Sequence, residues 1–227
     1  METTANKSKF GIKEIACIGM LTALAYAVMA LSKLIPINIA GFLTFDLKDV
    51  IIAICGFMFG PIPGVIVSVI VSLIEMITIS STGPIGMLMN IISTCAFIVP
   101  AAIIYRSNRK FSRALIGLVV GIFCMTAVMI LWNWLITPLY MGVSREEVVS
   151  MLLPVFLPFN LIKAAINAAL TLLLYNPIVT ALRKANLVAK SSSSAPKKKG
   201  LSIGVTLISL FVVASLVLVV LAWTEII

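Results

Sequence analysis

Long apolar runs alternate with short polar connections along the chain. Six of these runs have the roughly 17 to 25 residues that a helix needs to cross a bilayer, namely residues 15–35, 63–79, 85–105, 114–136, 157–182 and 201–223. A shorter run, residues 50–59, becomes a helix when it is extended back through Phe45 and Asp46, and residues 60–64, rich in Gly and Pro, then turn the chain. The pattern predicts an all-α integral membrane protein with six membrane helices and an additional transmembrane helix at the C-terminus.

A change in composition near residue 188 divides the chain. Connections before it are short, so residues 1–187 are expected to form one membrane domain. Residues 188–200 have the Ser and Lys bias of a flexible or solvated linker. Residues 201–227 then contain the additional helix, which is expected to be an accessory span because residues 201–223 carry no charge.

The composition supports a membrane protein, and the placement of charge orients it. Hydrophobic residues make up 61% of the 227 residues, and the mean hydropathy is +1.18. A net charge of +9 would also suit nucleic acid, but the basic residues lie between apolar runs, so the expected contact is the lipid bilayer. Most of them fall in alternate connections, which the positive-inside rule assigns to the cytoplasm together with the N-terminus: Lys7, Lys9, Lys13, Arg106, Arg109, Lys110, Arg113, Arg183, Lys184, Lys190 and Lys197 to Lys199.

The chain lacks the residues that most catalytic sites require. It contains no histidine, its four cysteines stand singly in apolar runs, and no P-loop motif is present. We therefore expect no enzymatic activity, no metal site and no cofactor.

Two outward connections are candidate covers for a site. Residues 36–49 mix apolar residues with Gly, Asn and Asp and are expected to fold back as a lid, although Asp46 or Asp49 would also suit an N-cap of the next helix, the role we favour for Asp49. The second cover begins with Ser144 and Glu147, which have capping-box spacing, and is expected to be a short helix on the outer membrane surface.

Aromatic residues stand just before the second cover. Trp132, Trp134 and Tyr140 fit a belt at the membrane interface, and they fit equally well as a platform that stacks on a flat ligand. The sequence leaves both interpretations open.

Polar residues inside the apolar runs mark the candidate site. A charge at membrane depth costs about 2.5–3.5 kcal/mol on insertion scales and by default indicates a functional site, so Lys163 is the leading candidate. Asn160 lies on the same helix face, and Glu75 and Asn133 fall in the same outer half, with Glu75 a possible ion-pair partner of Lys163. The alternative is that such residues tie helices together, which is a sufficient role for Asn90 and Asn167.

The groups available suggest the kind of ligand. Amides, one ammonium group and aromatic walls from Phe42, Phe45 or Tyr140 suit a flat, mostly neutral heterocycle with polar edges. Vitamins such as folate and thiamine would satisfy this chemistry.

Small residues four apart form a strip along the first helix, at Gly19, Ala23 and Ala27. Such a strip lets another helix approach closely. It suits docking of a separate protein, and it also suits packing within the chain.

Several motifs together resemble a known family, the substrate-binding S-components of energy-coupling-factor vitamin transporters, and among them the riboflavin-specific one. The resemblance rests on FLTFDLKDV at residues 42–50, on GFMFGP at residues 56–61 with Gly64, on Asn133 followed by PLY at residues 138–140, and on PFNLIK at residues 158–163. It covers about residues 13–184. The additional C-terminal helix departs from the six spans of the family.

The resemblance implies a function and a set of contacts. A protein of this kind lies in the bacterial cell membrane, captures riboflavin from outside and topples to release it through a module of one membrane coupling protein and two ATPase subunits. Asn133, Asn160 and Lys163 would contact the flavin ring, residues Gly41, Phe42, Leu43, Thr44 and Phe45 would cover it, and Ala23 and Ala27 would dock the coupling protein, with Gly19 in place of a further alanine.

Two other classes of protein remain as alternatives. A self-sufficient secondary carrier should show internal repeats, and no convincing repeat is present. A purely structural membrane subunit would bind no flavin.

Overall fold

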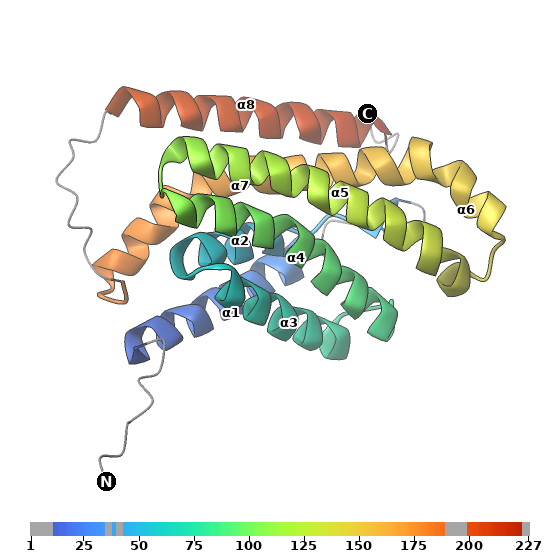
Figure 1. Ribbon diagram of the computed structural model, residues 1–227, viewed down its shortest axis with the longest axis horizontal. Helices are drawn as coiled ribbons and strands as arrows, with labels where there is room; N and C mark the ends of the chain where they lie inside the picture. The colour runs from blue at the N-terminus through green and yellow to red at the C-terminus, as the bar shows by residue number, and fades with distance from the viewer. Residues whose placement is uncertain (1–10, 35–37, 40–42, 189–198, 224–227) are drawn as a thin grey trace, which may run out of the picture.

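The structure is a computed structural model that describes residues 11–34, 38–39, 43–188 and 199–223. Figure 1 shows a bundle of helices with a minimal antiparallel hairpin, in which Asn38 pairs with Thr44 and Ile39 with Leu43. The elements in chain order are α1 (Ile12–Ser32), β1 (Asn38–Ile39), β2 (Leu43–Thr44), α2 (Lys48–Phe59), α3 (Pro61–Thr78), α4 (Gly83–Ser107), α5 (Phe111–Met141), α6 (Arg145–Met151), the π-helical turn η1 (Leu152–Phe156), α7 (Leu157–Lys184) and α8 (Lys199–Trp223).

The all-α membrane architecture predicted from the sequence is confirmed. Within the described residues, five helical stretches are long and apolar enough to cross a membrane: α1, α3, α4, α5 and the continuous stretch Arg145–Lys184. The apolar part of α8, Thr206–Ala222, is shorter. At about 1.5 Å per residue, the 12 residues of α2 extend well short of the roughly 30 Å hydrocarbon core, so α2 depends on protein neighbours.

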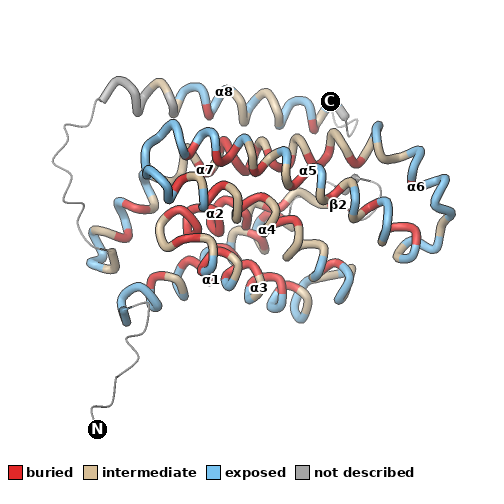
Figure 2. Tube along the Cα trace, in the orientation of Figure 1, coloured by how far each residue is buried: buried red, intermediate tan, exposed pale blue. Residues whose placement is uncertain are grey.

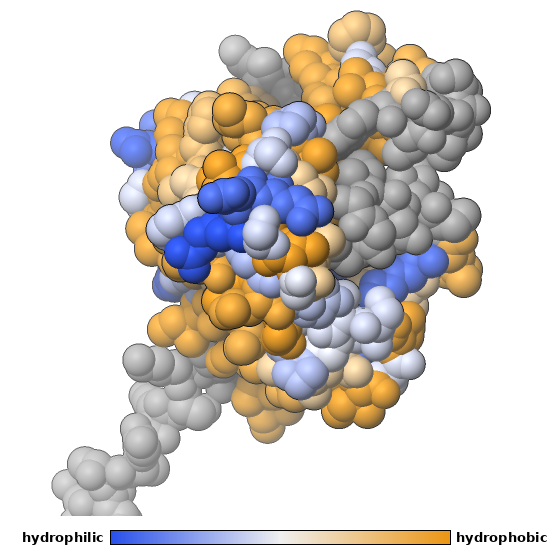
Figure 3. All heavy atoms as spheres, turned by 90° about the vertical axis from the view of Figure 1, so that its right-hand side faces the viewer, coloured by the Kyte–Doolittle hydropathy of each residue, from blue (hydrophilic) through white to orange (hydrophobic). Residues whose placement is uncertain are grey.

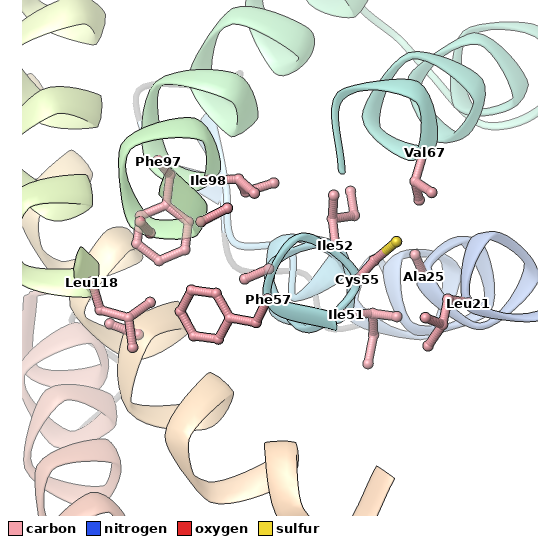
Figure 4. Close-up of a cluster of buried hydrophobic side chains, with 14 of the residues drawn as sticks. Leu21, Ala25, Ile51, Ile52, Cys55, Phe57, Val67, Phe97, Ile98 and Leu118 are labelled. Carbon is pink, nitrogen blue, oxygen red and sulfur yellow. The ribbon is translucent and has the colours of Figure 1, made fainter. Parts of the chain in front are cut away.

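Helix α2 forms the centre of the core. Its residues from Lys48 to Phe57 are all buried, and Figure 2 shows it enclosed by partly exposed helices. In Figure 4, Ile52 and Cys55 of α2 lie among side chains of the neighbouring helices, including Ala25 of α1, Val67 of α3 and Ile98 of α4. A helix that is apolar on every side is stable only when it is enclosed in this way.

A tight turn joins α2 to α3. Gly60 has a φ of 108°, which glycine adopts without the steric cost of a side chain, and Pro61 then occupies the first position of α3, where its missing N–H costs no hydrogen bond. The predicted turn at residues 60–64 is therefore shorter than expected, because α3 begins immediately after Gly60.

The start of α2 differs from the prediction. The helix begins at Lys48 instead of Phe45 or Asp46, and Leu47 holds the N-cap position without a side-chain hydrogen bond. Neither Asp46 nor Asp49 caps the helix. Both carboxylates are buried and bind side chains of other elements, so the capping role expected for Asp49 was wrong.

Helices α4 and α5 approach each other closely at two glycines. A Cβ on Gly117 would lie 2.7 Å from the carbonyl oxygen of Ala101, and one on Gly121 would lie 2.5 Å from that of Phe97. Backbone atoms cannot move aside as a flexible side chain can, so these glycines set the separation of the two helices.

This contact leads to a prediction about stability. Gly121→Ala is expected to destabilise the protein by about 1–3 kcal/mol through overpacking, although alanine normally stabilises a helix relative to glycine. Thermal unfolding of the purified protein followed by tryptophan fluorescence would measure it. Gly204→Ala is the control, because a Cβ there has no neighbour within 4 Å; equal melting temperatures for both variants would contradict the prediction.

The second predicted cover is an extension of α7. The Ser144 Oγ accepts a hydrogen bond from the Glu147 backbone N–H at 3.2 Å, as the spacing predicted, but α6 continues through η1 into α7 without a break. Pro154 and Pro158 account for the wide turn, since Pro158 has no N–H to donate back to the preceding turn. The turn lies directly before Asn160 and Lys163.

Helix α8 packs along α7 (Figure 1). Ser209 and Val220 are buried, whereas most of its large side chains, such as Leu207 and Phe211, are exposed. Of the linker predicted at residues 188–200, residues 189–198 lie outside the described part of the chain. The division into a domain, a linker and an additional helix stays a prediction.

Candidate ligand-binding site

A cavity of about 310 Å³ opens at the end of the bundle that carries α6, called here the α6 end. Its volume is at the lower limit of the roughly 300–1,000 Å³ typical of small-molecule sites. The lining comes from the C-terminal ends of α1 and α3, from the β2 segment and from α4, α5 and α7: Ser32, Lys33, Leu43, Thr44, Asp46, Glu75, Ile79, Ser81, Thr82, Met89, Asn90, Ser93, Met129, Phe159, Asn160 and Lys163.

The α6 end is the polar end of an apolar bundle. Figure 3 looks onto it and shows hydrophilic side chains gathered on this face with hydrophobic ones around them. Arg145, Glu146 and Glu147 of α6 are among the exposed residues. The cavity therefore lies close to a surface that suits water or lipid headgroups.

Alternating charges run through the floor and wall of the cavity. The Lys163 Nζ donates to Asp46 Oδ2 at 2.9 Å, and the Lys48 Nζ lies 3.8 Å from the same oxygen. Lys48 also donates to Glu75 Oε2 at 2.6 Å, and the Lys33 Nζ lies 2.7 Å from Glu75 Oε1. Lys163 therefore pairs with Asp46, and the direct pair with Glu75 that we considered from the sequence is not formed.

Asp46 is the acidic residue that the sequence analysis missed as part of the site. It lies between β2 and α2, outside the membrane-length helices. Burial alone would raise the pKa of its carboxyl, but the ammonium groups of Lys163 and Lys48 outweigh burial and lower the pKa to about 2. Its Oδ1 is buried and has no hydrogen-bond partner among the described residues, which leaves an ionised acceptor at the cavity.

Five of the residues predicted for the site line this cavity: Leu43, Thr44, Glu75, Asn160 and Lys163. Lys163 is only 7% exposed, and it lies one turn after Asn160, whose Nδ2 donates to the Phe156 carbonyl at 2.7 Å. Gly41 and Phe42, also predicted, lie outside the described residues.

Asn133 is buried but does not line the cavity. Its Nδ2 donates to the Met129 carbonyl at 2.7 Å, and its Oδ1 accepts from the Thr137 hydroxyl at 2.8 Å. Met129, one turn earlier on α5, lines the cavity instead. Contact between Asn133 and a ligand would require these bonds within α5 to change.

Of the three aromatic residues before α6, two lie beside the cavity and one lies on the exterior. Tyr140 and Trp132 line a small crevice that shares Thr82 and Met89 with the cavity wall. Trp134 is exposed, and the Arg145 guanidinium lies over its ring at 5.1 Å from the centroid. Trp134 therefore suits the interfacial belt, and Tyr140 lies beside the cavity rather than in it.

The two predicted covers pack against each other. Leu43 of the first connection and Val148 of α6 belong to one buried apolar cluster with Phe156 and Phe159. The ring of Phe45 lies on that of Phe159 with centroids 4.8 Å apart. Phe45 thus secures the cover to α7 and is not among the lining residues.

Further polar contacts join the helices around the cavity. Asp49 accepts hydrogen bonds from the Thr94 hydroxyl at 2.6 Å and from the Asn167 Nδ2 at 3.4 Å, while the Asn90 Nδ2 donates to Glu75 at 3.1 Å. These bonds join different helices, which is the tying role expected for Asn90 and Asn167.

Lys33 and Lys48 were not among the residues proposed from the sequence. The available signal was the density of charge around Asp46, Lys48 and Asp49 beside an apolar run. We expected this segment to fold back as a lid and favoured a helix-capping role for Asp49, whereas the fold buries Asp46, Lys48 and Asp49.

The small-residue strip of α1 lies on the exterior. Gly19, Ala23 and Ala27 are all exposed, and a Cβ on Gly19 would have no neighbour within 4 Å. The opposite face of α1, which includes Cys17 and Leu21, packs into the core. The strip is therefore accessible to a partner or to lipid.

Comparisons with known proteins give consistent matches. The family model described as "ECF transporter, substrate-specific component" matches residues 13–175. The riboflavin transporter RibU of Staphylococcus aureus (strain TCH60) is 28% identical over 178 residues, which are 76% of this chain and 93% of that protein. The riboflavin transporter FmnP of Bacillus subtilis (strain 168) is 27% identical over 164 residues, which are 68% of this chain and 86% of that protein.

A solved structure, described as "Structure and mechanism of the S component of a bacterial ECF transporter", matches with a TM-score of 0.63 and 29% identity. It covers 75% of this chain and 98% of the other. The family match includes every lining residue of the cavity, and it ends before α8.

Proposed function

The chain belongs to the substrate-specific components of ECF transporters, and we propose that it captures riboflavin in the cavity at the α6 end and delivers it to a separate ATP-driven coupling module. Two relatives that cover most of the chain are riboflavin transporters. Riboflavin is the transported ligand in this proposal and has no role as a cofactor.

One observation carries the proposal for the site: the buried ammonium of Lys163 lines a cavity of about 310 Å³ beside Asn160. An ammonium group and an amide supply directed hydrogen bonds to the carbonyl and ring-nitrogen edges of a flat heterocycle. Phe159, Met129 and Leu43 supply apolar contact for its faces. Asp46 and Glu75 add acceptors for the hydroxyl groups of a polyol chain.

The proposed orientation places the cavity on the outer side of the bacterial cell membrane and the N-terminus in the cytoplasm. The basic connection at Arg106, Arg109, Lys110 and Arg113 lies at the other end of α4 from the cavity, in agreement with the positive-inside rule. The partners are one membrane coupling protein, which docks on the strip Gly19, Ala23 and Ala27, and two ATPase subunits.

Titration of riboflavin with the purified protein tests the proposed function. We expect saturable quenching of flavin fluorescence at one site per chain, and no displacement by folate or thiamine. Absence of quenching would refute flavin binding, and displacement by another vitamin would reassign the ligand.

Uptake into vesicles separates the proposal from a secondary carrier. Vesicles that contain this protein alone should bind flavin without accumulating it, and addition of the coupling module with ATP should produce uptake. Accumulation driven by an ion gradient without the module would contradict the proposal.

A further inference from the structure

Lys48 has an unusual position for a lysine. It is the first residue of α2, its exposure is 1%, and it is not among the residues that line the cavity. A fully buried lysine is rare and requires paired acceptors, because the ammonium group loses its hydration. The residues that pair with Lys48 therefore indicate its role.

Both partners of Lys48 are carboxylates that line the cavity. The Nζ lies 2.6 Å from Glu75 Oε2 on α3 and 3.8 Å from Asp46 Oδ2 in the segment before α2. Glu75 Oε1 and Asp46 Oδ2 have outer partners of their own, Lys33 and Lys163. Lys48 thus approaches both acids from the protein side, while the other two lysines approach from the cavity side.

The charged residues around the cavity explain why Lys48 matters to ligand binding. Lys33 and Lys163 both line the cavity, so a ligand that accepts a hydrogen bond from Lys163 competes with Asp46 for that ammonium group. Asp49 adds a further carboxylate nearby. Without an inner cation, the two lining carboxylates would repel each other or turn toward water.

We propose that Lys48 is a positioning residue for ligand binding, which holds the carboxylates of Asp46 and Glu75 against the cavity while Lys163 turns to the ligand. The inference rests on the proposed function, because it concerns how the same cavity binds riboflavin. Lys48 itself does not touch the ligand.

Substitution of Lys48 tests the inference. Lys48→Met keeps an unbranched apolar stem, one atom shorter than lysine, and removes the charge. It is expected to weaken riboflavin binding about 10- to 100-fold, as for groups that orient the ligands of a metal site. Lys48→Arg keeps the charge and should recover most of the affinity. Wild-type affinity in Lys48→Met would overturn the inference.

The dependence of binding on pH distinguishes positioning from a merely structural role. Asp46 faces Lys163 of α7, Lys48 and Asp49 of α2, Lys33 at the end of α1 and Glu75 of α3. Loss of Lys48 removes one cation that lowers the pKa of Asp46, so that pKa should rise and Asp46 should take up a proton as the pH falls. Lys48→Met is therefore expected to lose further affinity at a higher pH than the wild type as the pH is lowered; coincident profiles would count against the inference.

A double variant keeps the test decisive if Lys48→Met does not fold. Lys48→Met combined with Glu75→Gln also removes the carboxylate on α3 that would lose its nearest cation. Because Lys48 acts in part through Glu75, the loss of affinity in the double variant should be smaller than the sum of the two single losses, and strictly additive losses would overturn the inference. Wild-type protein that binds no flavin would instead refute the proposed function, so the two failures are distinguishable.

Discussion

Lys163→Ala is expected to weaken riboflavin binding by about 2–5 kcal/mol, a loss of roughly thirtyfold or more in affinity. The truncation removes a charged donor from the cavity and leaves the buried carboxylate of Asp46 without its nearest cation, at 2.9 Å. Both effects weaken riboflavin binding, because Asp46 also lines the cavity. Titration of flavin fluorescence with the purified variant measures the change.

The control is the same substitution on the same helix. Lys184 lies at the far end of α7 and is exposed, so Lys184→Ala should bind riboflavin like the wild type. An affinity of Lys163→Ala equal to that of Lys184→Ala would remove Lys163 from the site. A second substitution, Lys163→Met, keeps the apolar stem and should show the same loss if the charge is what matters.

The course of the helices could be predicted from the sequence because the bilayer fixes it. Each apolar run had to form a helix to satisfy its backbone groups in lipid, so residues 85–105 and 114–136 became α4 and α5. The ends of the helices differ from the predicted ends where polar residues could continue a helix at the membrane surface. Helix α5 extends through Pro138 to Met141, and α7 is joined to α6, because water and headgroups tolerate such ends.

The ion pairs of the site could not be predicted from the sequence, since they join residues far apart in the chain. Lys163 and Asp46 are separated by 117 positions. The preference for acidic residues at helix N-termini suggested that Asp46 or Asp49 caps the next helix. That was the simpler explanation for an acidic residue before an apolar run. Tertiary contacts prevailed because the buried ammonium groups of Lys48 and Lys163 pair with Asp46. Asp49 is bound by Thr94 and Asn167.

The level of the cavity along each helix was a further feature that the sequence did not show. The sequence showed that Asn160 and Lys163 share a face, since they are about one turn apart, and both line the cavity. On α5, Met129 and Asn133 also share a face, but the sequence did not show at which turn of that face the cavity lies, and Met129 rather than Asn133 lines it. Periodicity relates residues of one helix to each other, whereas packing against α4 and α7 decides which of them reach a shared cavity.

Ala23→Trp is expected to leave riboflavin binding intact and to reduce ATP-dependent uptake strongly. The strip formed by Gly19, Ala23 and Ala27 is exposed on α1, whereas the residues of α1 and its end that line the cavity are Ser32 and Lys33. A tryptophan at position 23 fills the surface along which a partner helix would approach. Overpacking of about 1–3 kcal/mol corresponds to a loss of roughly 5- to 150-fold in docking.

Two measurements on each variant make this prediction specific. Flavin titration reports the cavity, and uptake into vesicles with the coupling module and ATP reports docking. Ala127→Trp is the matched control, because Ala127 is exposed on α5, which lies across the bundle from α1 in Figure 1. If both variants transport at the wild-type rate, the strip faces lipid only; if Ala23→Trp also loses flavin binding while Ala127→Trp keeps it, α1 contributes to the cavity and not to docking alone.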